Sequence, residues 1–206
     1  MYAGIILAGG QSRRMGRDKA LLPLPGAEHV PFISHLATLL LKVCAEVVLV
    51  TRDADQSAAY APYLSPSVRV VADQVPAIGP LMGLASGLHA IQSSHALVTA
   101  VDTPFLQPAL LAFLLAQPLD NRLLVPLVEA IPQVLLAVYP HAVLPTIEAC
   151  LREGRRDPRS LLRIVPTRFI EEALLRQVDP DLRSFFNVNT PDELARSYDE
   201  LSSSGA

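Results

Sequence analysis

The feature of the sequence that most constrains the fold is an alternation of short apolar runs with longer segments of helical periodicity. Four short runs have the length and composition of buried strands: Tyr2–Leu7, Glu46–Val50, Val68–Val71 and Ala96–Val101. Three longer segments carry apolar residues at helical spacing: Pro31–Cys44, Leu81–Ile91 and Pro108–Ala116. Strands that are apolar along their whole length are typical of a parallel sheet that helices cover on both faces. The first half of the chain therefore predicts a three-layer α/β fold with a mostly parallel central sheet.

The pattern changes after about residue 120. Leu123–Val125 and Val134–Tyr139 have the character of strands, but no long helix separates them, so we expect an antiparallel strand at the edge of the sheet. The remaining predicted elements are helices at Leu144–Glu153 and Arg159–Ile164, a short strand or extended segment at Phe185–Val188, and a helix at Pro191–Leu201 with Thr190 as its N-cap. The sequence has no internal repeat and no linker, which predicts one domain over residues 1–206.

Composition excludes several classes of protein. A formal net charge of −3 argues against a protein that coats nucleic acid or an anionic membrane. No apolar stretch reaches the roughly 18 residues that a membrane span needs, and the N-terminal apolar run is too short for a signal peptide. Cys44 and Cys150 are far apart and fit a reducing compartment. We therefore expect a soluble, cytoplasmic protein that binds neither nucleic acid nor membranes.

The first predicted strand runs into a glycine-rich basic loop, Leu7-Ala8-Gly9-Gly10-Gln11-Ser12-Arg13-Arg14-Met15-Gly16-Arg17-Asp18-Lys19. It matches neither GxGxxG nor the P-loop pattern. Glycines nevertheless allow the backbone to approach a ligand closely, and successive N–H groups can bind anions. The loop also carries four cations: Arg13, Arg14, Arg17 and Lys19. Because it follows the first parallel strand, it is expected at the edge where open α/β sheets bind ligands, although a solvated basic loop is the alternative.

Asp102 comes directly after the fourth predicted strand, in Val101-Asp102-Thr103-Pro104-Phe105. A carboxylate at the end of a buried strand is a common site for a divalent cation, and Mg²⁺ usually takes one or two carboxylates together with phosphate oxygens. The alternative is that Asp102 caps the following turn, for which the Thr-Pro step is suitable.

The loop sequence Leu-Ala-Gly-Gly-x-Ser-x-Arg-Met-Gly-x-Asp-Lys resembles the signature of the molybdenum cofactor guanylyltransferases. These proteins belong to the nucleotidyltransferase superfamily, which has a Rossmann-like fold. Related cytidylyltransferases more often carry Leu-Ala-Ala-Gly, so Gly10 and the Asp18-Lys19 step favour the guanylyl branch. Further segments are similar to the family: Val70–Asp73, Gly79–Leu88, Val101–Phe105, Ala137–Tyr139, Gly154–Leu162 and Phe186–Asp192.

The resemblance implies a nucleotide-binding part at residues 1–105 and an acceptor side at residues 120–190. The implied GTP site consists of Leu7, Ala8, Gly9, Gly10, Lys19, Asp73, Gly79 and Asp102. Within it, the implied catalytic residues are Lys19, Arg13 and Asp102, with Asp102 as the ligand of the cofactor Mg²⁺. Asp73 would contact guanine; the alternative is an exposed aspartate at a strand end. Gly79 and Gly83 would allow close approach of the nucleotide, although glycines here also suit tight packing of a helix on a sheet.

The implied acceptor residues are Arg155, Arg156, Asn187 and Asn189. The planar guanidinium of arginine suits phosphate, but these arginines also fit an exposed helix end in an arginine-rich chain. Asn187 or Asn189 would offer a carbonyl oxygen to Mg²⁺, directly or through water, whereas the local alternative is a turn and helix cap. The loop Glu129–Val134 departs from the family, which often has a glycine and a basic residue there.

The reaction that the resemblance implies is transfer of GMP from GTP to molybdopterin that carries molybdenum, with release of pyrophosphate. Molybdenum-insertion proteins or molybdoenzyme chaperones are implied as further partners. Two alternatives stay open. One is a pterin cytidylyltransferase or another nucleotidyltransferase of the same superfamily, and the other is a non-catalytic carrier of a nucleotide or cofactor.

Overall fold

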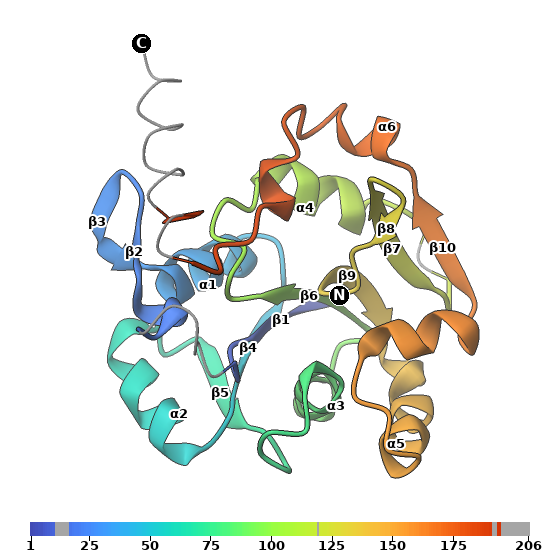
Figure 1. The fold of residues 1–206 in the computed structure, drawn as a ribbon, viewed down its shortest axis with the longest axis horizontal. Coiled ribbons are helices and arrows are strands. Elements are labelled where there is room, and N and C mark those ends of the chain that lie inside the picture. Colours follow the sequence, from blue (N-terminus) through green and yellow to red (C-terminus); the bar gives the residue numbers. More distant parts are fainter. Residues whose placement is uncertain (11–16, 119, 191–192, 195–206) are drawn as a thin grey trace.

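In the computed structural model, which describes residues 1–10, 17–118, 120–190 and 193–194, one sheet of eight strands runs through the molecule (Figure 1). Its strands are β1 (Tyr2–Leu7), β4 (Glu46–Thr51), β5 (Val68–Ala72), β6 (His95–Ala100), β7 (Leu123–Val128), β8 (Ile131–Pro132), β9 (Leu136–Pro140) and β10 (Thr167–Ile170). Their order is β10-β7-β9-β6-β1-β4-β5, and β8 pairs with β7.

The four strands predicted in the first half of the chain are confirmed as β1, β4, β5 and β6. They pair in parallel, with Ile5 of the central β1 opposite Val48 on one side and Val98 on the other. Their bounds lie within one residue of the predicted ones. The carboxyl ends of all four strands therefore meet at one edge of the sheet, where open α/β sheets bind ligands.

The predicted antiparallel strand is present as β9, and it lies inside the sheet. It runs antiparallel to β6 on one side and to β7 on the other, while β10 pairs in parallel with β7 and takes the edge. β7 and β8 form an antiparallel hairpin whose two turn residues, Glu129 and Ala130, have φ of 50° and 60°. Such a turn normally takes asparagine or glycine, because other side chains are strained at positive φ.

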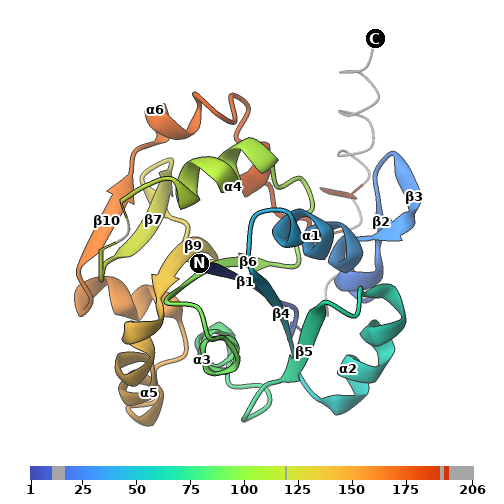
Figure 2. The same cartoon turned by 180° about the vertical axis from the view of Figure 1, so that it is seen from behind.

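Helices cover both faces of this sheet. The helices in the described part of the chain are α1 (Phe32–Leu41), α2 (Ala54–Tyr60), α3 (Pro80–Ala90), α4 (Pro108–Leu115), α5 (Leu144–Arg152) and α6 (Glu172–Leu175). Figures 1 and 2 show α1 and α4 on one side of the sheet and α3 and α5 on the other. Strand residues alternate between the two cores: Ile6 and Leu49 pack with α1 and α4, whereas Ile5 and Val48 pack with α3 and α5. The predicted three-layer α/β fold is confirmed.

Several short elements were not predicted. They are the hairpin of β2 (Pro23–Leu24) with β3 (Ala27–Pro31), together with α2, β8, β10 and α6. The helix predicted at Arg159–Ile164 is instead a 3-10 helix over Pro158–Arg163, which the side chain of Asp157 caps. None of the helices in the described ranges is both long enough and apolar enough to span a membrane.

The segment predicted at Phe185–Val188 begins at the last residue of a 3-10 turn, Arg183–Phe185, and continues from an extended Phe186 without forming a strand. Its Val188 N–H donates to the carbonyl of Asp102 at 2.8 Å, which ties this distant segment to the end of β6. Most of the predicted last helix lies outside the described residues. Its start is described: Thr190 Oγ1 accepts from Glu193 N (3.2 Å), and Glu193 Oε2 accepts from Thr190 N (3.0 Å). This reciprocal capping box confirms Thr190 as the N-cap.

Candidate functional site

A cavity of about 380 Å³ opens at the carboxyl ends of the parallel strands. It is lined by the end of β1, the start of α3 and the turns that follow β5 and β6. All of the residues predicted for a GTP site line it: Leu7, Ala8, Gly9, Gly10, Lys19, Asp73, Gly79 and Asp102. The predicted catalytic residue Arg13 lies outside the described residues, together with the rest of 11–16. The structure thus brings together residues that are more than ninety positions apart in the sequence.

Lys19 lies between two oxygen-bearing side chains in this cavity. Its ammonium donates to Asn189 Oδ1 at 2.7 Å, and it lies 3.6 Å from Asp102 Oδ2. The side chains of Lys19 and Asp102 are only 14% and 26% exposed, so water screens their attraction less than it screens a surface pair. One cation therefore joins the loop after β1, the turn after β6 and the C-terminal segment.

The turn that follows β6 fixes Asp102. Thr103 Oγ1 donates to the carbonyl of Ala100 at 2.7 Å and is 2.9 Å from Thr99 Oγ1, so threonine side chains close the turn. The carboxylate of Asp102 is left to face Lys19 and the cavity. Position and partner thus favour an electrostatic role for Asp102 over the alternative role of a turn cap.

The oxygens around Lys19 suit a hard divalent cation. Asp102 offers a carboxylate and Asn189 an amide oxygen, and both already contact one positive charge. Within the described ranges no group of three or more His, Cys, Asp or Glu side chains could hold a metal. A site with one carboxylate is typical of Mg²⁺ that also takes oxygens from a bound phosphate.

Asp73 lies on the opposite wall of the cavity, after β5. Its Oδ1 is buried and has no hydrogen-bond partner among the described residues. Burial raises the pKa of this carboxyl to about 6, although Ser86 partly offsets the effect. A Cβ at Gly9 would lie 3.3 Å from Asp73 Oδ2, and one at Gly83 would lie 3.6 Å from Oδ1. The two glycines therefore leave space beside a carboxylate that needs donors, and buried acceptors are rarely left unpaired.

The start of α3 requires glycine at position 79. Gly79 has a φ of 119°, and a Cβ there would lie 3.3 Å from the carbonyl oxygen of Arg156. That carbonyl accepts from Leu81 N at 3.0 Å, so it satisfies one of the first N–H groups of α3. Gly87, in contrast, serves packing, because a Cβ there would lie 2.6 Å from Ile5 Cγ2. The predicted use of glycine for tight packing of the helix on the sheet thus occurs at Gly87, whereas close approach of a nucleotide to Gly79 and Gly83 stays a prediction.

A second cavity of about 400 Å³ adjoins the first and shares Pro80, Ala100, Asp102 and Leu135 with it. Three of the predicted acceptor residues line it: Arg156, Asn187 and Asn189. Pro132, Gln133 and Val134 also line it, and they belong to the loop that departs from the family pattern; Leu135 and Leu136 follow them along the wall of the cavity.

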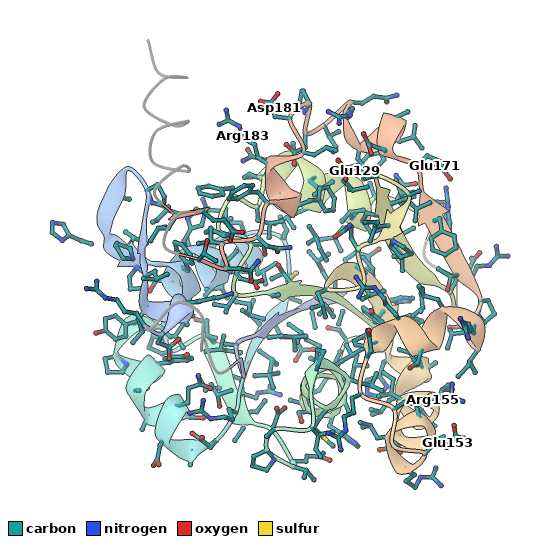
Figure 3. The ribbon with its side chains drawn as sticks, viewed as in Figure 1. Glu129, Glu153, Arg155, Glu171, Asp181 and Arg183 are labelled. Carbon is teal, nitrogen blue, oxygen red and sulfur yellow. The ribbon has the colours of Figure 1, made fainter. Side chains whose placement is uncertain are left out.

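Arg155 lies elsewhere. Its guanidinium pairs with Glu153 Oε2 at 2.8 Å, and it lines a neighbouring surface hollow, which shares Asp157 and Arg159 with the second cavity. Figure 3 shows Arg155 and Glu153 side by side next to α5. The two neighbouring arginines that were predicted together are therefore separated, and only Arg156 lines the second cavity.

Asp18 and Leu135 are among the lining residues of these cavities to which sequence reasoning gave no role in the site. Asp18 accepts from Ala20 N at 3.1 Å and caps the 3-10 helix Lys19–Leu21, and an aspartate just before a helical turn is a recognisable cap signal. Leu135 lines both cavities. An apolar residue before a strand carries no such signal.

Comparison with known proteins gives consistent matches. Residues 4–173 match the family described as MobA-like NTP transferase domain. A protein of Chloroflexus aggregans named probable molybdenum cofactor guanylyltransferase is 38% identical over 199 residues, which cover 94% of this chain and 92% of that protein. One of the same name from Methanosarcina mazei is 32% identical, over 93% of this chain and 88% of that protein. The crystal structure of molybdopterin-guanine dinucleotide biosynthesis protein A from Archaeoglobus fulgidus has a TM-score of 0.81 at 26% identity, over 98% of this chain and 99% of that one.

Proposed function

This chain belongs to the MobA-like NTP transferase family, and we propose that it transfers GMP from GTP to molybdopterin that carries molybdenum, with release of pyrophosphate. Relatives named for this activity are 30% to 38% identical over nearly the whole chain. The observation that carries the proposal is the cavity at the strand ends, where Lys19, Asp73 and Asp102 converge from three separate loops.

Asp73 is proposed to select guanine. The base presents adjacent N–H donors on one edge, and an ionised carboxylate can accept from two of them. The buried, unpartnered Oδ1 supports this role, because a bound donor would satisfy it. Gly9 and Gly83 leave space for the base beside Asp73. A cytosine presents a different donor pattern, so the same carboxylate discriminates between the two nucleotides.

Lys19 is proposed to neutralise the triphosphate and the pyrophosphate that leaves. The attacking group is a phosphate oxygen of the acceptor, which is already anionic, so the reaction needs no strong general base. Catalysis then consists mainly of positioning and charge stabilisation. On this proposal the Lys19 ammonium exchanges its contacts with Asn189 and Asp102 for phosphate oxygens when GTP binds.

Asp102 and Asn189 are the residues that would hold Mg²⁺, since their oxygens already surround a cation. The ion would act as a Lewis acid and a template for the phosphate oxygens. The second cavity is proposed as the acceptor side, with Arg156 as a phosphate contact. The unpaired Cys44 and Cys150 support a reducing compartment, which we propose is the cytoplasm.

The test is to incubate the purified protein with Mg²⁺, molybdopterin that carries molybdenum, and either GTP or CTP. We expect pyrophosphate and a guanine dinucleotide product with GTP, and neither with CTP. Equal or greater activity with CTP would identify a cytidylyltransferase instead. GTP binding without any release of pyrophosphate would identify a non-catalytic carrier.

A further inference from the structure

Three hydrogen bonds in series connect the end of β4 with the residue that precedes Lys19. The backbone N–H of Arg52 donates to Gln56 Oε1 at 2.8 Å. Gln56 Nε2 then donates to the hydroxyl of Tyr60 at 2.7 Å, and that hydroxyl donates to Asp18 Oδ2 at 2.7 Å. Both side chains belong to α2, one turn apart, and this helix contributes no residue to the cavity itself.

The two side chains in the middle of this series, Gln56 and Tyr60, are buried, and the Tyr60 hydroxyl is its central group. Tyr60 is 0% exposed and Gln56 is 5% exposed. Burial and the hydrogen bond to Asp18 raise the pKa of Tyr60, which keeps its phenol protonated and able to donate. The ring packs in the core with α1, a task that a phenylalanine could perform equally well. The hydroxyl therefore serves its hydrogen-bond partners, since a buried polar group without partners is costly.

Asp18 is fixed through both carboxylate oxygens. Oδ1 accepts from Ala20 N and so caps the turn that Lys19 begins, while Oδ2 accepts from Tyr60. A carboxylate held at both oxygens has one orientation, and it fixes the direction in which the next residue leaves the backbone. That residue is Lys19, whose ammonium reaches Asn189 Oδ1 and faces Asp102.

We propose that Tyr60, held in turn by Gln56, is a positioning residue for the ammonium of Lys19. It acts through Asp18 and touches no substrate. The kinetic side of this inference rests on the proposed function, because it concerns the lysine that would neutralise the triphosphate. Its structural side does not, because the position of Lys19 can be observed without turnover.

The kinetic test is a double-mutant cycle of Tyr60→Phe with Lys19→Ala. We expect Tyr60→Phe alone to lower kcat for GMP transfer by about tenfold or more, because a misplacement of about 1 Å costs up to about a hundredfold. KM for GTP should change by less than about threefold, since the contact between Lys19 and the phosphate oxygens is expected to be strongest in the transition state. In the Lys19→Ala background the same substitution should change kcat by less than about twofold, because the positioned group is gone. An equal loss in both backgrounds would indicate general damage and would overturn the proposal.

The structural test uses the fact that the chain has only two lysines, Lys19 and Lys42. With ¹³C-labelled lysine, Tyr60→Phe should shift the Cε signal of Lys19 and leave that of Lys42 in place. Tyr139→Phe is the matched control, because Tyr139 is also 0% exposed and its hydroxyl donates to the carbonyl of Val134 at 2.7 Å. It should lower stability without moving the Lys19 signal. An unmoved Lys19 signal in Tyr60→Phe refutes the proposal.

The two tests also separate this inference from the proposed function. A wild-type protein that transfers no GMP, but whose Lys19 signal shifts in Tyr60→Phe, would refute the function and retain the positioning role. If Tyr60→Phe does not fold, Gln56→Met carries the same measurements, because it keeps the bond from Tyr60 to Asp18 and removes the Gln56 donor to Tyr60, together with the acceptor of the Arg52 N–H. We expect Gln56→Met to lower kcat and to shift the Lys19 signal, each by less than Tyr60→Phe does. No change in kcat or in the Lys19 signal would overturn the proposal.

Discussion

The substitution Asp73→Asn should make the ligand-free protein more stable and its binding of GTP weaker. The carboxylate is held where burial raises its pKa to about 6, and its Oδ1 has no partner among the described residues. Asparagine has nearly the same shape but carries no charge. The side chain that is proposed to recognise guanine therefore lowers stability in the free protein.

The size of the effect follows from the pKa. A rise from 3.8 to about 6 corresponds to about 3 kcal/mol of lost stability at neutral pH, and partial exposure of Asp73 to water reduces this to about 1.5 kcal/mol. Below about pH 4 the carboxyl is protonated in both the folded and the unfolded protein, so it does not lower the free energy of unfolding there. The loss of stability caused by the ionised carboxylate grows as the pH rises from about 4 and reaches its full size above about 6. The gain from Asp73→Asn should thus be largest at neutral pH and roughly half as large at pH 5.

Binding should respond in the opposite direction. A hydrogen bond to a charged group contributes about 1.5–3 kcal/mol, so replacing the carboxylate should raise the Kd for GTP by about ten- to a hundredfold. Urea unfolding without nucleotide at pH 7.5 and pH 5 measures the first effect, and calorimetric titration with GTP measures the second. Asp53→Asn is the control, because hydrogen bonds lower the pKa of Asp53 and its neutralisation should reduce stability. An Asp73→Asn protein that is less stable at pH 7.5, or that binds GTP as tightly as wild type, would refute the reasoning.

Three further predictions concern other parts of the molecule. Lys19→Ala and Asp102→Ala should each lower turnover by about a hundredfold or more, as loss of one electrostatic contact in a transition state commonly does. Both variants should still unfold cooperatively in urea, and near-normal pyrophosphate release in both would contradict their roles. Ala130→Gly should raise the free energy of unfolding by about 0.5–1 kcal/mol in urea titrations, because Ala130 has a φ of 60° and glycine tolerates it. Arg156→Ala should raise KM for molybdopterin about tenfold, whereas Arg155→Ala should leave it unchanged in the same assay, because, of these two arginines, Arg156 alone lines the second cavity, which is the proposed acceptor side.

The parallel half of the sheet could be predicted because its physical signal is strong. β1, β4 and β6 are covered on both faces, so nearly all of their residues are apolar, and the bounds follow from the composition. The edge strand β5 is only partly buried, but three of its five residues are valines. The same regularity placed the loop after β1 at the ligand-binding edge and brought Asp73 and Asp102 to one cavity. Asp18 was part of the motif as well, but it received no role in the site, because the sequence does not show that its carboxylate binds Ala20 N and the Tyr60 hydroxyl.

Elements that depend on distant contacts were not predictable. β10 has only four residues, and it becomes a strand because its backbone pairs with β7, more than forty positions earlier. The place of β9 inside the sheet depends on register with β6 and β7, which local patterning does not encode. Arg155 and Arg156 are adjacent and chemically identical, but the carbonyl of Arg156 accepts from Leu81 at the start of α3, whereas the guanidinium of Arg155 pairs with Glu153.

The helix α2 shows why a motif alone does not define this site. Its residues that pack inward are Gln56 and Tyr60, which lie on one helical face but are polar, so no apolar stripe marks the helix. Yet these two side chains hold Asp18, and through it the only lysine of the signature loop. On the proposed function, the motif specifies which cation would face the phosphates, and we propose that a buried polar pair outside the motif specifies where that cation lies. A relative with the same loop but an apolar pair on this helix would therefore need another donor for the aspartate, or would place its lysine less well.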